Sequence, residues 1–310
     1  MTALDYQIRA AEWGITDPRT AIAVYACLGD NPELIEHAGE LPKTIKDVEE
    51  WVKSTILSSK NPMFDYFATV PEEVLGQEPS KGLNMVLWMM VSKYRNMHQL
   101  SRLSSSREGI REELQPFIDA GMISSYTDPL NPENELFGIT SRRLRFHYAM
   151  MSDHVGYWRR GRMHHILWRR LHARFDRYVV RNEAAHAVRL WAQSPAGAGR
   201  LGFDVPYAQR LLVPDSEAQK LRTSEFSLWD GTENATLLGL GTLRWGLTMR
   251  YGQAVRLRKL QLLLAENGVK GADDAPLYCI GTKFEQGVHE LAEQQKISLI
   301  QPHDLFTPHL

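Results

Sequence analysis

Arginine side chains recur at helical spacing in the middle of this 310-residue sequence. On a helical wheel with about 100° per residue, four of them fall within about 60° of one another: Arg170, Arg174, Arg177 and Arg181. At about 1.5 Å of rise per residue, this predicted arginine row is about 16 Å long. Guanidinium groups bind phosphates and carboxylates through paired hydrogen bonds. The row therefore predicts a surface for a polyanion, either the phosphates of a nucleic acid or the carboxylates of a partner.

The charge of the chain is distributed unevenly, although the net charge is only −1. Residues 1–80 carry a net charge of −8, residues 81–141 carry −1, residues 142–200 carry +10, and residues 201–310 carry −2. All 13 cations of the basic segment are arginine. Two interpretations stay open at this point. The basic segment pairs with the acidic N-terminal region inside the chain, or it binds an external polyanion.

A second basic run spans Asn234 to Ala265, and no acid lies between Glu233 and Glu266. We expect this run to be helical, with its glycines allowing close helix packing. The glycine spacing does not match the dinucleotide-binding pattern and follows no predicted strand.

Together the two basic runs supply the predicted nucleic-acid-binding residues: Arg159, Arg160, Arg162, Arg169, Arg170, Arg174, Arg177, Arg181, Arg244, Arg250, Arg256, Arg258 and Lys259. Aromatic rings interleaved with cations are typical of proteins that stack the bases of single strands. The candidates for stacking are Tyr157, Trp158 and Trp168.

The arginine row requires a long helix, predicted from about Arg162 to Gln193. The buried stripe of that helix is expected to consist of Leu167, Leu171, Phe175, Tyr178 and Val179.

Residues 80–141 show the element order of a winged-helix module. Ser80 can cap a helix that runs to about Asn96 and is apolar almost all round, so we expect it to be buried. A second helix is predicted from about Ser106 to Ala120, followed by two short strands, MISSYT and ELFGIT, around a loop. The second helix carries net charge −2, which disfavours insertion into a DNA groove. We expect this module to have a structural or protein-binding role.

The ends of the chain contain further regular elements. The pair Asp17 and Pro18 predicts a helix start, Gly29 predicts its end, and Thr44 with Asp47 predicts another start. The tail predicts a strand (APLYCIG), a helix from about Thr282 to Gln295, and a strand (KISLI). The expected fold is mainly α, with an acidic helical region at 1–79, the winged-helix-like module at 80–141, an arginine-rich long helical segment at 142–200, and a helical region at 201–310 that ends in a small β-α-β element.

Residues for catalysis or metal binding do not form a recognisable set. The histidines of the basic segment lack the i, i+3 or i, i+4 spacing of two helical metal ligands, and Glu183 with His186 forms only one E-x-x-H pair. Common hydrolase, zincin, redox and phosphate-binding motifs are missing. Asp273 and Asp274 read as a turn, and Cys27 and Cys279 as small apolar residues. We predict no catalytic residue, metal or cofactor, although an enzyme with a dispersed site near Asp273 stays open.

The sequence has two cysteines and no apolar run of about 18 residues, and its start lacks the plan of a signal peptide. We therefore expect a cytoplasmic protein. The favoured function is binding of a nucleic-acid backbone, as a non-catalytic subunit of a larger nucleoprotein assembly. The alternative is a scaffold protein whose arginine face docks an acidic protein partner.

Overall fold

The structure is a computed structural model that describes residues 3–92, 94–102, 107–161, 164–215, 217, 219–232 and 235–306. The chain forms two compact units, each described here by itself. Unit 1 comprises Met1–Glu12, Asp128–Pro132 and Glu183–Leu310, and unit 2 comprises Trp13–Thr127 and Glu133–Asn182.

Unit 2 begins with a group of short helices whose ends follow local sequence signals. Helix α2 starts at Pro18, where the Asp17 carboxylate accepts a hydrogen bond from the amide of Arg19, and it ends before Gly29 at φ 57°. Both ends were predicted. Helix α4 starts later than predicted, because the amide and hydroxyl of Thr44 donate to the Asp47 carboxylate (3.2 and 2.7 Å) and form a turn that precedes the helix. The helices of this region are α2 (Pro18–Leu28), α3 (Pro32–His37), α4 (Val48–Thr55), α5 (Met63–Ala68) and α6 (Val70–Leu75).

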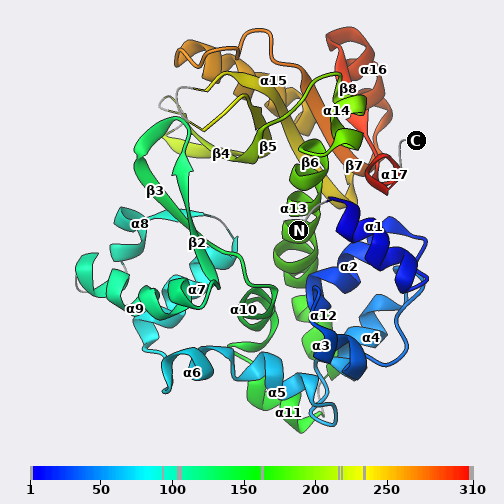
Figure 1. The fold of residues 1–310 in the computed structure, drawn as a ribbon, viewed down its shortest axis with the longest axis vertical. Helices are drawn as coiled ribbons and strands as arrows, with labels where there is room; N and C mark the ends of the chain where they lie inside the picture. Colours follow the sequence, from blue (N-terminus) through cyan, green and yellow to red (C-terminus); the bar gives the residue numbers. More distant parts are fainter. Residues whose placement is uncertain are drawn as a thin grey trace. The chain divides into compact units, whose positions relative to one another are not determined.

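The middle of unit 2 contains the helices and strands predicted for residues 80–141, together with two elements that the sequence did not reveal. The additional elements are β1, a short strand at the end of the range predicted for the first helix, and α8, a short helix that follows it. Figure 1 shows α8 close to α9. The three strands pair in the order β1-β3-β2. The bounds are α7 (Lys81–Ser92), β1 (Arg95–Asn96), α8 (Met97–Ser101), α9 (Arg107–Asp119), β2 (Ile123–Asp128) and β3 (Asn131–Ile139).

The basic segment forms helices α10 (Arg142–Phe146), η1 (His147–Met151), α11 (Val155–Arg160), α12 (His164–Arg174), η2 (Phe175–Val180) and α13 (Arg181–Ala192). The last three follow one another without a break, as predicted for the long helix. Four of its five expected core side chains are buried, while Tyr178 is half-buried. However, η2 is a π-helical turn, whose wider hydrogen-bonded ring adds a residue to the turn. The 100° step therefore does not hold from Arg170 through to Arg181.

Unit 1 contains a five-stranded sheet in the order β4-β5-β6-β7-β8 (Figure 1). The pairs β4/β5 and β5/β6 are antiparallel, whereas β6/β7 and β7/β8 are parallel and are connected by helices α15 and α16. The strands are β4 (Tyr207–Asp215), β5 (Lys220–Trp229), β6 (Leu237–Met249), β7 (Leu277–Phe284) and β8 (Ile297–Ile300). The helices are α1 (Ala3–Glu12), α14 (Pro195–Leu201), α15 (Tyr251–Glu266), α16 (Gln286–Gln295) and α17 (Pro302–Phe306). Unit 1 also includes α13 from Glu183 onward.

The mixed sheet shows that the expected mainly α fold is wrong. Strands β4, β5 and β6 lie within residues 207–249. The sequence predicted helix over most of 234–265 and no strand over 201–233. Strand β6 buries every second residue from Leu237 to Trp245, but two of these five positions are glycine, and Leu238 and Leu240 lie on the other face. The sequence therefore lacks the apolar alternation that identifies a half-exposed strand. The predicted strand, helix and strand of the tail are present as β7, α16 and β8, but they continue the large sheet instead of forming a small element.

The core of unit 1 lies between this sheet and the two crossover helices. Leu257, Leu260 and Leu264 of α15 and Leu291 of α16 pack with strand residues such as Leu240. The glycines of β6 were predicted to allow close packing of helices, but they lie in the sheet. A Cβ at Gly241 would lie 2.7 Å from Cδ1 of Phe226 and 3.0 Å from the carbonyl oxygen of Tyr278. Glycine at this position therefore lets neighbouring side chains lie directly against the strand.

No helix within the described part of the chain combines the length and the apolar character needed to cross a membrane.

Candidate nucleic-acid interface

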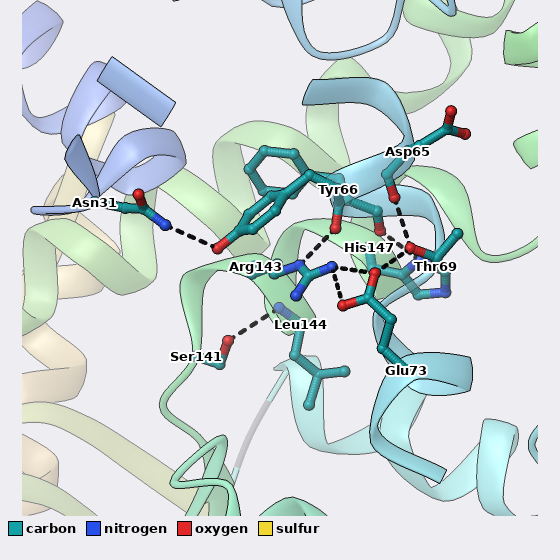
Figure 2. A network of polar contacts seen from close by, with 10 residues as sticks. Asn31, Asp65, Tyr66, Thr69, Glu73, Ser141, Arg143, Leu144 and His147 are labelled. Carbon is teal, nitrogen blue, oxygen red and sulfur yellow. Dashed lines mark hydrogen bonds and ion pairs between the residues drawn. The ribbon is translucent and has the colours of Figure 1, made fainter. Parts of the chain in front are cut away.

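Two groups are distinguished among the arginines of the basic segment. The arginines of the first group contact other elements of unit 2. Figure 2 shows Arg143 of α10 at the centre of a network that joins it to α5 and α6. Its Nη2 donates to both carboxylate oxygens of Glu73 at 2.7 Å, and its Nε donates to the carbonyl oxygen of Tyr66. The guanidinium lies 3.8 Å from the centroid of the Tyr66 ring. Burial works against the Glu73 charge, but hydrogen bonds from Thr69 and Arg143 prevail and lower the pKa of that carboxyl.

A second arginine of this group, Arg159 of α11, donates to the Asp65 carboxylate at 2.8 Å. Its guanidinium also lies 5.2 Å from the Phe64 ring centroid. In addition, Arg142 lies 4.7 Å from the ring centroid of Tyr25. These contacts confirm, for Arg143 and Arg159, the interpretation in which the basic segment pairs with the acidic N-terminal region. Arg159 was among the predicted nucleic-acid-binding residues, but its guanidinium forms an ion pair with Asp65.

The second group comprises Arg170, Arg174 and Arg177, which we call the arginine cluster. Arg170 and Arg177 are exposed, and Arg174 is half-buried. Within the described residues no carboxylate lies at ion-pair distance from any of the three. Arg169, next to the cluster, is also exposed and without an ion pair in the described chain. The stretch from His164 to Arg181 contains five arginines and a single acid, Asp176. The cluster is therefore a cationic surface with little internal neutralisation.

Arg181 does not extend this cluster as predicted. It lies beyond the π-helical turn η2, which changes the direction in which the following side chains point, and it is half-buried and has contacts within the structure. The row outside Arg181 thus runs from Arg170 to Arg177, a distance of about 10 Å at the rise of a helix.

Helix α7 has two exposed apolar side chains whose exposure was not predicted, and one of them contacts the arginine cluster. The side chains of Met85 and Trp88 are 53% and 38% exposed, although α7 was expected to be buried all round. The guanidinium of Arg174 lies 5.7 Å from the centroid of the Trp88 ring, within the range of a cation–π contact. The spacing of Lys81, Met85 and Trp88 at i, i+4 and i+7 was the available signal, because it places a charged residue on the same face.

The predicted stacking residues behave differently from one another. Trp158 is 0% exposed and donates through Nε1 to the carbonyl oxygen of Met150, and Trp168 is 6% exposed. Both belong to the core, and the prediction that they stack on bases is wrong. Tyr157 is 48% exposed, with the guanidinium of Arg160 lying 5.3 Å from its ring centroid. Arg162 lies outside the described residues.

The second predicted basic run lies in unit 1. Arg244 is half-buried on β6, and Arg250 precedes α15 with its Nε 3.7 Å from the Glu285 carboxylate. Arg256, Arg258 and Lys259 are exposed on α15, and none has an ion pair among the described residues. The same helix exposes Tyr251, Val255 and Leu262.

Titratable side chains in the described part of the chain differ in burial and in their partners. No group of three or more His, Cys, Asp or Glu side chains in the described ranges has an arrangement that could hold a metal ion. His147 is buried with its Nδ1 2.9 Å from the carbonyl oxygen of Phe67, and burial lowers its pKa to about 4. Asp273 and Asp274 are exposed in a turn before β7. Burial raises the pKa of the Cys279 thiol to about 12, so this thiol is a poor nucleophile at neutral pH.

Helix α9, which would enter a groove in a DNA-reading winged helix, exposes Arg111 and Glu112. Arg111 lies 3.5 Å from the Glu135 carboxylate of β3, so part of its charge is neutralised. The exposed cations of unit 2 therefore lie on α12 and η2 to a greater extent than on α9. No protein-family model, curated protein or solved structure matches the chain.

Proposed function

We propose that this protein binds the phosphate backbone of a nucleic acid through the arginine cluster, as a non-catalytic subunit of a nucleoprotein assembly. The observation that supports the proposal is the contrast between the two groups of arginines. Arg143 forms an ion pair with Glu73, and Arg159 forms one with Asp65. In contrast, Arg170 and Arg177 are exposed and have no carboxylate at ion-pair distance in the described chain.

Solvated faces of helices normally mix charges of both signs, because pairs of opposite charge at i and i+4 stabilise a helix. The arginine cluster lacks such pairs, so an external polyanion would gain the full attraction of its guanidinium groups. Arginine also binds phosphate more specifically than lysine does, through two parallel hydrogen bonds. A backbone contact of this kind does not read sequence, and it weakens steeply with salt because counterions are released.

The experiment is a salt titration of binding to single-stranded and double-stranded DNA and RNA. The test variant carries Arg170→Glu and Arg177→Glu. The control variant carries Lys46→Glu and Lys60→Glu, two exposed cations of the same unit, so both variants have the same net charge.

We expect the test variant to bind at least about 10-fold more weakly, and the slope of log K against log salt to fall in magnitude by about 2 for a duplex, because two phosphate contacts are lost. The control variant should keep the slope of the wild type. Equal binding by the test variant and the wild type at every salt concentration would contradict the proposal.

A second candidate function is docking of an acidic protein partner on α15. It is supported by the exposed apolar side chains of Tyr251, Val255 and Leu262, which lie on the same helix as Arg256 and Lys259. Cations alone suit phosphates, whereas an apolar and cationic face suits an amphipathic acidic helix. The probe is a synthetic amphipathic helix rich in Glu and Leu. If the proposal holds, Lys259→Glu and Leu262→Ser each weaken its binding, while Lys296→Glu does not. If neither change has an effect, this second candidate is wrong.

A further inference from the structure

We infer that the nucleic acid bound at the arginine cluster is single-stranded and that one of its bases stacks on Trp88. This inference rests on the proposed function, since it specifies which form of nucleic acid the cluster binds.

The exposure of Trp88 is the first observation. Helix α7 is otherwise a core helix, with Leu83, Val86, Leu87, Met90 and Val91 all buried. An indole is among the largest apolar side chains, so leaving it 38% exposed gives up part of the free energy of burial. Met85, one turn away, is 53% exposed, and the two side chains form a small apolar patch on a helix that buries five other apolar side chains. Trp88 lies beside Arg174 of the arginine cluster, and apolar surface bordered by charged residues is typical of binding sites.

The charges around Trp88 indicate what that partner is. Arg174 lies against the ring, while Arg170 and Arg177 are about one helical turn from Arg174 on either side. Lys81 is exposed at the start of α7, on the same face as Met85 and Trp88. The ring therefore lies among cations that have no carboxylate partner in the described chain, which favours a polyanion that also carries flat apolar groups.

A single-stranded nucleic acid meets both conditions. Its phosphates pair with cations, and its unstacked bases present π-faces to aromatic side chains in a way that tolerates any sequence. In a duplex the bases are stacked on one another, and a helix surface that contacts the backbone has no free base to cover an indole. The three arginines alone would serve either form, but the open indole beside them favours the single strand.

The probes are a fluorescein-labelled 15-nucleotide single strand of mixed sequence and the duplex formed with its complement. Both are titrated with the wild type, Trp88→Ala, Trp88→Phe and Met85→Ala at several salt concentrations. Met85→Ala is the matched control, because Met85 is exposed on the same helix but has no ring for stacking.

We expect Trp88→Ala to weaken single-strand binding by about 5-fold or more, the range of one stacked base, and to leave the duplex affinity and the salt slope unchanged. Trp88→Phe should recover most of the loss, because it restores a ring, and Met85→Ala should stay close to the wild type. Thermal unfolding followed by circular dichroism checks that each variant is folded, and Trp88→Leu, which keeps an apolar side chain but has no ring, replaces the alanine variant if that variant is not folded.

Equal weakening of single-strand and duplex binding by Trp88→Ala would overturn the inference, and so would unchanged binding of both, as expected if Trp88 docks a protein. The Arg170→Glu and Arg177→Glu variant separates the two proposals. If it weakens both nucleic acids while Trp88→Ala has no effect, the proposed function stands and the single-strand inference fails. If it has no effect on either nucleic acid, the proposed function itself fails.

Discussion

Nη2 of Arg143 lies 2.7 Å from both carboxylate oxygens of Glu73, and the same guanidinium lies 3.8 Å from the centroid of the Tyr66 ring. The side chain of Arg143 is only 15% exposed. One arginine thus connects α10 to both α5 and α6 (Figure 2). Arg143 and Arg170 have the same chemistry but differ in burial and in partners, since Arg170 is exposed and has no carboxylate at ion-pair distance in the described chain.

The first prediction concerns this contact. Arg143→Lys should lower the free energy of unfolding by about 1 kcal/mol, since lysine can neither make the paired hydrogen bonds nor lie flat on the ring, and since solvent screens the half-exposed Glu73. Urea denaturation measures the change. Arg177→Lys is the control and should change the free energy by less than about 0.5 kcal/mol, because the side chain is exposed. Similar effects of the two substitutions would count against the structural role of Arg143.

The second prediction concerns the dependence of stability on pH. Burial, with a smaller effect of the Arg143 charge, lowers the pKa of His147 from 6.5 to about 4 in the folded protein. The unfolded chain therefore binds a proton at a pH where the folded chain does not, and this contribution to stability is lost as pH falls from about 6.5 to about 4, by about 3 kcal/mol in all. His147→Gln should flatten the pH dependence of urea unfolding in this window. The exposed His98→Gln serves as the control and should leave it unchanged.

The third prediction tests the packing of the five-stranded sheet. A Cβ at Gly241 would lie 2.7 Å from Cδ1 of Phe226, so Gly241→Ala should lower the free energy of unfolding by about 1–3 kcal/mol through overpacking. At Gly252, in the first turn of α15, a Cβ would have no neighbour within 4 Å. Gly252→Ala should therefore raise stability by up to about 1 kcal/mol, because alanine loses less backbone entropy on folding. The opposite order of the two variants in thermal unfolding would contradict the strand assignment of β6.

The fourth prediction concerns α9. If its acids faced phosphates, each pair of like charges at about 4 Å would cost about 1 kcal/mol even in water. Glu112→Gln together with Glu113→Gln should therefore leave any sequence preference intact and raise non-specific affinity slightly. Competition between oligonucleotides of different sequence measures both quantities. Loss of binding to one preferred sequence would mean that these carboxylates accept hydrogen bonds from cytosine amino groups in the major groove.

The sequence by itself determined both ends of α2, the long helix and the segregation of charge. Asp17, Pro18 and Gly29 fix the two ends of α2 through contacts within one or two turns, so no distant residue is needed to predict them. The buried stripe from Leu167 to Val179 likewise follows from periodicity along one element.

Only the tertiary structure decided the pairing of strands and the partners of each arginine. Strand β6 pairs with β7, although the whole of α15 lies between them in the sequence. Glycines at two buried positions of β6 weaken the alternation that would separate it from a helix. Arg143 and Glu73 are 70 residues apart, so nothing in the local sequence distinguishes that arginine from the solvent-facing Arg170. Trp88 and Trp158 also cannot be told apart by local sequence. Trp158 is in the core, whereas Trp88 is exposed beside Arg174, because burial depends on which elements pack around each ring.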